Sequence, residues 1–247
     1  MRRDELPTNP ATPSVLQQRI RLGVDVWHGI NPQKLDWTKL RETHSFVLIR
    51  MCYGASPDRL CVEHTNRARA AGFSLGAWMF FRPTQTVEKQ VEVFAKQARA
   101  CGVGTGWIVP ALDIEDDTPK GTPQVPVAPN WAGPIRRILS AWHNCYGARP
   151  LVYCSHRDWT RLDSPAWLLE YHQWTPHWDA KRPRVPGDVG WTIWQNTGKP
   201  MPGIYDTRIA QDVARGPLPR IPTITPRGRR RVEGVRNITI DDAVRNR

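Results

Sequence analysis

Residues 107–115 read WIVPALDIE and are apolar at nearly every position until two acids near the end. A short run that is apolar on both faces is typical of a strand buried in a parallel sheet. Similar runs recur along the chain, so we expect six further strands of this kind. They span residues 20–27, 46–53, 75–81, 150–154, 171–178 and 191–196.

Helical patterns separate the first of these strands. Residues 61–71, 87–101 and 132–146 repeat apolar side chains at helical spacing. Strands that alternate with helices predict βα units and a parallel sheet with right-handed crossovers. In the last third the strands follow each other without convincing helices, which favours antiparallel pairs that close the sheet. The sequence therefore predicts an α/β fold, and 247 residues suit a single β/α barrel.

The composition places the barrel between two basic extensions. The formal charge is +12, of which residues 216–247 carry +5 and residues 1–22 carry +2, so the 193 residues between them carry +5. We therefore expect an extension at 1–19, a barrel domain at 20–215 and an irregular Pro- and Arg-rich arm, outside the core, at 216–247. A basic nucleic-acid-binding domain is disfavoured, because the charge gathers at the ends. Hydrophobic residues at 40% exclude wholesale disorder.

Several classes of site and of targeting signal are not indicated. The N-terminus has no apolar segment of a secretory signal peptide, and no apolar run of 18 residues predicts a membrane span. The five cysteines lack metal-ligand spacing and are expected to be reduced and mostly buried. The seven histidines show no metal-binding spacing either. We predict no metal and no cofactor.

The two acids in WIVPALDIE are the strongest candidates for chemistry. Strand alternation places Asp113 and Glu115 on one face, with Cα atoms roughly 6.5–7 Å apart. Burying unpaired carboxylates is costly, and the C-terminal strand ends of a β/α barrel face the active site. Asp25 ends the first strand and would reach the same rim, where repulsion raises the pKa of at least one acid. The alternatives are a solvated turn or cation-binding loop for the pair, and a turn or cap residue for Asp25. Asp116 and Asp117 are expected to be exposed loop acids.

Twelve tryptophans are unusual beside five tyrosines and five phenylalanines. The indole offers a broad face and one donor, which suits stacking on sugar rings or bases. Five aromatic residues fall at or near strand ends and are candidates for substrate binding, with core packing as an equal alternative for each. They are Tyr53, Phe80, Tyr153, Trp174 and Trp194.

Seven motifs, in order along residues 20–212, resemble the glycoside hydrolase family 25 lysozymes, the Chalaropsis-type N,O-diacetylmuramidases. The resemblance implies a flattened β/α barrel with about five βα units and a short antiparallel section. It also implies hydrolysis of the β-1,4 bond between N-acetylmuramic acid and N-acetylglucosamine in peptidoglycan. The motifs are GVDVW at 23–27, FVLIRMCYG at 46–54, AGFSLGAW at 71–78, PALDIE at 110–115, ARPLVYCS at 148–155, WTIWQNTG at 191–198 and PGIYD at 202–206.

The resemblance also implies roles for individual residues. Glu115 matches the general acid, Asp113 its partner carboxylate and Asp25 the acid of the first strand. Asp206 is the nearest fit to the fourth acid, with Asp212 as a rival, because the Asn expected two residues after Asp206 is absent.

Two further positions bear on the resemblance. Gln195 matches the WQ motif and is expected to bind the substrate or a catalytic acid. Trp27 stands where the family usually has a small polar residue.

The residues leave the mechanism open between retaining, inverting and substrate-assisted hydrolysis. We favour Glu115 as acid and then base, with Asp113 steadying the 2-acetamido group or the attacking water. The alternative function is an inactive barrel that binds peptidoglycan or forms part of a virion.

Delivery to the substrate is a separate expectation. The RGRRR run at 227–231 suggests anionic wall polymers or a virion protein as partners of the arm, with peptidoglycan glycan strands as the substrate. Without a signal peptide, we expect a phage-type lysin held in the host cytoplasm until release, or a virion-associated enzyme.

Overall fold

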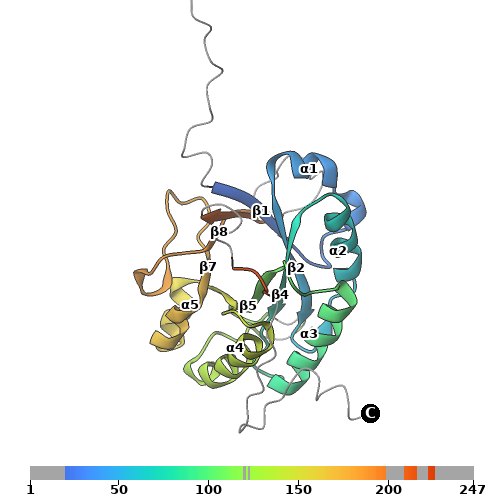
Figure 1. The fold of residues 1–247 in the computed structure, drawn as a ribbon. Coiled ribbons are helices and arrows are strands. Elements are labelled where there is room, and N and C mark those ends of the chain that lie inside the picture. The colour runs from blue at the N-terminus through green and yellow to red at the C-terminus, as the bar shows by residue number, and fades with distance from the viewer. Residues whose placement is uncertain (1–19, 119–120, 122, 199–208, 216–221, 226–247) are drawn as a thin grey trace, which may run out of the picture.

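The computed structural model describes residues 20–118, 121, 123–198, 209–215 and 222–225. Their strands form one sheet in the order β1-β9-β8-β7-β6-β5-β4-β2-β3, and an additional pairing of β1 with β2 closes eight of them into a barrel (Figure 1). The strands are β1 (Ile20–Val26), β2 (Phe46–Tyr53), β3 (Ser56–Pro57), β4 (Ser74–Phe80), β5 (Ile108–Ile114), β6 (Leu151–Cys154), β7 (His172–Pro176), β8 (Ile193–Thr197) and β9 (Gln211–Arg215).

The described ranges contain five α-helices, which surround the barrel (Figure 1). They follow β1, the β2–β3 hairpin, β4, β5 and β6 in turn, so the expectation of about five βα units is confirmed. The three longer helices match the sequence patterns, whereas the two short ones were not predicted. The helices are α1 (Trp37–Thr43), α2 (Cys61–Ala70), α3 (Val87–Cys101), α4 (Ala132–Tyr146) and α5 (His156–Arg161).

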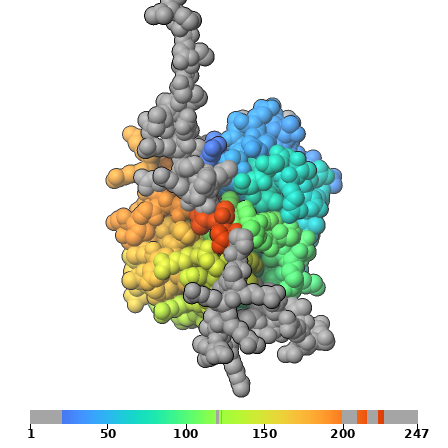
Figure 2. Space-filling view, in the orientation of Figure 1, coloured from blue at the N-terminus to red at the C-terminus, as the bar shows by residue number. Residues whose placement is uncertain are grey.

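The predicted antiparallel section does close the barrel in the last third of the chain, but it involves fewer strands than expected. β6, β7 and β8 run parallel to one another. α5 and the 3₁₀ helix η4 (Ala166–Glu170) connect β6 to β7, and the 3₁₀ helix η5 (Pro186–Asp188) connects β7 to β8. Among the eight described barrel strands, β9 supplies the antiparallel pairings, with β8 on one side and β1 on the other, and β3 pairs antiparallel with β2 outside the barrel. In the space-filling view the orange-red and red C-terminal segments sit between the blue-to-green and yellow-to-orange parts of the chain (Figure 2).

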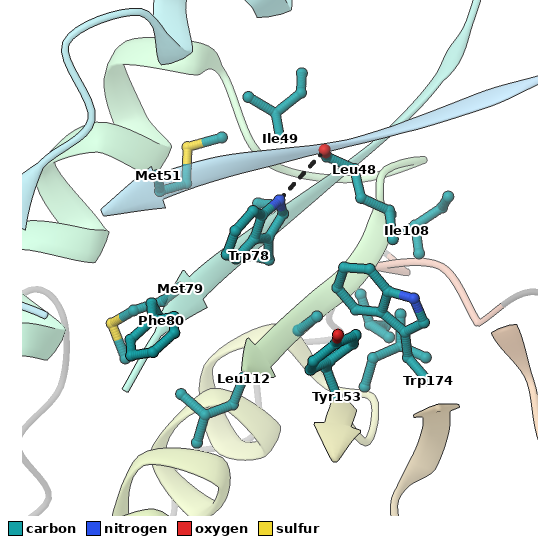
Figure 3. Packing of buried hydrophobic residues seen from close by; sticks show 14 of the residues in the cluster. Leu48, Ile49, Met51, Trp78, Met79, Phe80, Ile108, Leu112, Tyr153 and Trp174 are labelled. Carbon is teal, nitrogen blue, oxygen red and sulfur yellow. Dashed lines mark hydrogen bonds between the residues drawn. The ribbon is translucent and has the colours of Figure 1, made fainter. Parts of the chain in front are cut away.

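The barrel interior is filled by large aromatic side chains. Figure 3 shows Trp78, Tyr153 and Trp174 gathered there, each from a different strand. The ring centroids of Trp174 lie 6.3 Å from Trp78 and 4.8 Å from Tyr153, in edge-to-face contacts. The Trp78 indole donates a hydrogen bond to the backbone oxygen of Leu48, at 3.3 Å. A packed interior leaves the chemistry to the barrel rim, as in other β/α barrels.

Part of the basic arm belongs to the core. Residues 222–225 pair with the start of β5, where Thr223 bridges Ile108. The Ile224 N–H donates to the Trp107 oxygen at 2.8 Å, and the Ile224 side chain is buried. The expectation that the arm beyond residue 216 lies wholly outside the core is therefore wrong for this segment, because an isolated apolar residue between prolines carries no periodic signal.

The cysteines were expected to be reduced and mostly buried, and no membrane span was expected. Cys52, Cys61, Cys101 and Cys154 are buried, and none of the five cysteines forms a disulfide. Across the described ranges, no helix combines the length and the apolar composition needed to span a bilayer.

Candidate active site

Carboxylates gather inside one end of the barrel. Asp113 is the second-last residue of β5 and lies in register with Phe80 of β4 and Tyr153 of β6. Asp212 of β9 lies in register with Gln195 of β8 and with Gly23 of β1. Asp25 lies two residues after Gly23 and therefore on the same face of β1. Residues in register share a face of the sheet, so these side chains all point into the barrel. Glu115 follows β5 directly, on the same face as Asp113.

Burial sets the protonation of this cluster. It raises the pKa of Asp25 to about 7, against the opposing effects of the Gln195 hydrogen bond and the Arg50 charge. The pKa of Asp113 lies well above its ordinary value because of burial and the neighbouring charges of Glu115 and Asp25. Burial, followed by the charge of Asp25, also raises the pKa of Asp212 well above its ordinary value. Carboxylates that are buried and crowded in this way release their protons at a higher pH than exposed carboxylates do.

Glu115 is less enclosed than the three aspartates. Burial raises its pKa to about 7, with smaller contributions from the charges of Asp158, Asp25 and Asp116, and Arg157 opposes the shift. A carboxyl that is protonated near neutral pH and still reaches the barrel rim has the properties of a general acid.

Hydrogen bonds to Gln195 and Trp174 orient two of the acids. The Gln195 amide nitrogen donates to Asp25 Oδ2 at 2.8 Å. The oxygen of the same amide accepts from the Tyr153 hydroxyl and from the Trp178 indole, each at 2.9 Å. Trp174 donates to Asp212 Oδ1 at 2.7 Å.

Two buried oxygens, Asp113 Oδ1 and Asp212 Oδ2, have no hydrogen-bond partner within the described part of the chain. Unpaired buried oxygens are costly, so they mark places where a ligand can supply the missing donor.

Arg50 is a functional candidate that the sequence reasoning missed. Its buried guanidinium lowers the pKa of both Asp25 and Asp113. It forms an ion pair with the fully buried Asp58, with Nε 3.0 Å from Oδ2, and also contacts His28. The available signal was a lone charge in the apolar run FVLIRMCY, since a buried charge requires partners.

The two acids after Glu115 are not exposed, so that expectation is wrong. Asp117 is fully buried and accepts hydrogen bonds from the Tyr53 hydroxyl and from Arg82 Nε, the latter at 3.0 Å. Asp116 accepts from Arg161 at 2.9 Å and lies 3.3 Å from the Arg157 guanidinium. Both acids are held by residues distant in sequence, which a local pattern does not reveal.

The predicted aromatic residues are placed unevenly. Tyr53 is partly buried at the rim, whereas Phe80 and Tyr153 are buried and Trp174 is only 2% exposed. Trp194 precedes Gln195 on β8, so its side chain lies on the opposite face of the strand and points away from the acids. Its indole N–H donates to the backbone oxygen of His177.

The exposed large aromatic residues in the described ranges are Trp27 and Trp178, at 38% and 56%. Asp206 lies outside the described residues, so the structure places only its rival Asp212 in the cluster.

Comparisons with known proteins identify the family and the fold. The profile described as glycosyl hydrolases family 25 matches residues 24–203. A lysozyme from Streptomyces coelicolor superposes with a TM-score of 0.70 at 22% identity, covering 81% of this chain and 94% of that one. A family 25 lysozyme from Aspergillus fumigatus gives 0.68 at 22% identity, with coverages of 81% and 96%.

The catalytic domain of an endolysin from a bacteriophage of Listeria monocytogenes gives a TM-score of 0.61 at 16% identity, covering 79% of this chain and 93% of that one. No curated protein sequence matches this chain. At these identities the solved structures establish a shared fold. The family profile covers well over half of the chain, and the chain therefore belongs to glycosyl hydrolase family 25.

Proposed function

We propose that this glycoside hydrolase is a muramidase that cleaves the β-1,4 bond between N-acetylmuramic acid and N-acetylglucosamine in peptidoglycan. The observation that carries the proposal is the Glu115 carboxyl, with a pKa raised to about 7 at the barrel rim beside the buried Asp113. Membership of family 25 and the shared fold with lysozymes support the choice of substrate.

Glu115 is the general acid in this proposal. It protonates the glycosidic oxygen as the bond breaks, and the resulting carboxylate then takes a proton from the attacking water. Asp113 interacts with the 2-acetamido group or with that water, because its Oδ1 lacks a partner among the described residues. The acetamido oxygen is itself a competent nucleophile, so a substrate-assisted route needs no covalent enzyme intermediate.

Asp25 and Asp212 complete the acidic cluster in this proposal. Asp212 is favoured over Asp206 as the fourth acid because it is buried on β9 in register with Gln195, which binds Asp25. Both aspartates hold sugar hydroxyl or amide groups, and Asp25 also tunes the charge felt by Glu115, because its charge raises the pKa of that carboxyl.

The decisive experiment compares wild type with Glu115→Gln on a peptidoglycan suspension. The glutamine keeps the size and hydrogen-bonding capacity of the side chain but cannot donate the proton. We expect loss of turbidity with wild type only. Reducing-end analysis should find new N-acetylmuramic acid ends, whereas N-acetylglucosamine ends or free peptides would assign a different bond. Equal activity of the two proteins would remove Glu115 from its role, and an inactive wild type that still binds would favour the inactive-barrel alternative.

We further propose that residues 226–247, the part of the basic arm that follows the core segment and is called the tail below, draw the enzyme to its substrate. Residues 227–231, RGRRR, carry charge suited to anionic wall polymers, and attraction of this kind weakens as salt screens it. A phage-type lysin released from the host cytoplasm would use such a tail to reach the wall. A virion-associated enzyme would use it to dock on a virion protein. Salt-dependent retention on purified walls supports the first partner, and salt-resistant binding to virion proteins supports the second.

A further inference from the structure

Trp27 is an exposed indole fixed in position beside the acids. It follows β1 directly, two residues after Asp25, and 38% of it is exposed. The backbone oxygen of Trp27 accepts the Ile30 N–H at 2.9 Å and lies 3.3 Å from His64 Nε2. These contacts fix the main chain from which the indole projects.

The ring itself is held by two further neighbours. The Arg50 guanidinium carbon lies 4.9 Å from the centroid of the Trp27 ring, a cation–π contact. The benzo edge of the ring lies against Gly29, where a Cβ atom would come within 2.2 Å of it. Gly29 therefore makes room for this one orientation of the indole. An aromatic surface that is already ordered loses little conformational freedom when a ligand covers it.

The same arginine connects Trp27 to the acids. Arg50 lies close enough to lower the pKa of both Asp25 and Asp113, and its own ion pair with Asp58 holds it in place. Trp27 follows Asp25 by two residues at the end of β1, so the two side chains project from the same face of the chain.

We propose that Trp27 is a stacking platform for a pyranose ring of the glycan, bound next to Asp25 and supported from behind by Arg50 and Gly29. The proposal rests on the proposed muramidase function and adds a binding residue to it. A pyranose offers an apolar C–H face of about the width of an indole, whereas the neighbouring carboxylates and amide satisfy its hydroxyl groups. This pairing of one aromatic face with convergent polar groups is typical of small-molecule sites.

The test uses soluble glycan strands freed of peptides, with initial rates measured over a range of strand concentrations. We expect Trp27→Ala to raise KM about tenfold, an effect in the range of other aromatic stacking contacts, while kcat stays within about twofold. Trp27→Phe should recover part of the loss. Gly29→Ala should also raise KM, although the tryptophan remains, because the new methyl group displaces the ring. Val62→Ala, which trims another exposed apolar side chain on α2, is the matched control and should leave both constants unchanged.

Each outcome separates this proposal from the function on which it rests. An unchanged KM in Trp27→Ala, with wild type active, overturns the stacking platform and leaves the muramidase assignment intact. A lower kcat at constant KM also overturns it, since Trp27 would then act through Arg50 on the acids. If wild type neither cleaves nor binds the strands, the proposed function fails first. Thermal melting of every variant identifies any that has lost its fold. If Trp27→Ala is one of them, the KM of Trp27→Phe, which keeps an aromatic ring, is compared with that of wild type instead.

Discussion

Single residues determine how many protons the acidic cluster carries. Asp25, Asp113 and Asp212 are buried inside the barrel, and the Arg50 guanidinium lowers the pKa of the first two without cancelling the effect of burial. Glu115 stands nearer the rim, where the charge of Arg157 opposes the upward shift of its pKa. The division into buried acids and one accessible acid separates a group that donates a proton from groups that hold the substrate.

The pKa of Glu115 predicts the alkaline limb of the pH–activity profile. A general acid works only when protonated, so activity should fall as the pH rises through about 7. Arg157→Gln removes a nearby positive charge, which should raise the pKa of Glu115 and move this limb to higher pH. Initial rates on soluble glycan strands between pH 5 and pH 9, at roughly constant ionic strength, measure the shift.

Arg149→Gln is the control for that profile, because Arg149 is an exposed arginine paired with Glu170. It should leave the alkaline limb in place. A limb that moves equally in both variants would reflect general surface charge, and Glu115 would then not be the group that titrates.

Burial of Asp113 predicts a stability penalty that grows with pH. The folded protein keeps the Asp113 proton well above pH 3.8, whereas the unfolded chain releases it near that value. Folding then binds a proton, so this group's contribution to stability is fully present below pH 3.8 and is lost as the pH rises towards the folded pKa. Asp113→Asn stays neutral and should be more stable than wild type at neutral and alkaline pH, while losing activity.

Thermal melting at several pH values measures this difference. Each kcal/mol relieved should raise the Tm of a domain of this size by about 2–4 °C. The gap between Asp113→Asn and wild type should be smallest near pH 4 and should widen above it. Glu42→Gln, at an exposed position, controls for the loss of one negative charge. A gap that does not depend on pH would mean that the amide simply packs better than the carboxyl.

At the scale of elements, helix α3 ends at a residue that needs glycine. Gly102 caps the helix with φ 70° and ψ 37°, and its N–H donates to the backbone oxygens of Ala98 and Arg99. A Cβ there would meet no atom closer than 3.5 Å, so the cost of Gly102→Ala is the left-handed backbone alone. We expect a loss of about 1 kcal/mol in the free energy of unfolding, measured by urea titration.

Gly104→Ala supplies the matched control two residues away. A Cβ at Gly104 meets nothing within 4 Å, and its backbone is not left-handed. This change should be neutral or slightly stabilising, because alanine restricts the unfolded chain. Equal losses at both positions would show that the loop as a whole, and not the helix cap, is sensitive to substitution.

Elements with a strong local signal were predictable, and those defined by distant partners were not. The seven apolar runs became β1, β2 and β4 to β8, and the three long helical patterns became α2, α3 and α4. In the short helices α1 and α5, the main sequence signal for a helix is the N-cap residue, Asp36 in α1 and Ser155 in α5. β9 reads QDVAR and joins the sheet through its two antiparallel partners rather than through an apolar run.

The same distinction holds for the site. Asp25, Asp113 and Glu115 were predictable from acids at the ends of apolar strands. The burial of Asp117 depends on Tyr53 and Arg82, which come from other parts of the chain. Similarly, the burial of Trp174 depends on its contacts with Trp78, Tyr153 and Asp212 around the barrel.

At the scale of the whole molecule, the site and the C-terminal segment lie at opposite ends of β5. Glu115 follows the last residue of that strand, whereas Thr223 pairs with its first residue, Ile108. Seven extended residues separate the two ends by about 20 Å. The segment 222–225 therefore stabilises the barrel from the end remote from the chemistry.

Two truncations separate the structural role of this segment from the role of the tail after it. A chain that ends at residue 225 keeps the buried Ile224 and its backbone hydrogen bonds, and it should melt at the same temperature as the full chain. A chain that ends at residue 221 lacks both. Its free energy of unfolding should fall by about 2–5 kcal/mol, the usual cost of emptying a buried isoleucine site. Ile224→Ala in the full chain should show most of the same loss, measured by thermal melting.

Residues 226–247 hold seven arginines and three acids, a charge of +4 that the chain ending at residue 225 lacks. We expect that shorter chain to hydrolyse soluble glycan strands at the full rate, because the site lies at the other end of β5. Its retention on purified cell walls at low salt should drop to the level that the full chain shows at about 1 M salt, where the Debye length is roughly 3 Å. Equal retention of both chains at every salt concentration would assign wall binding to the barrel itself, and the tail would then have no part in delivery to the wall.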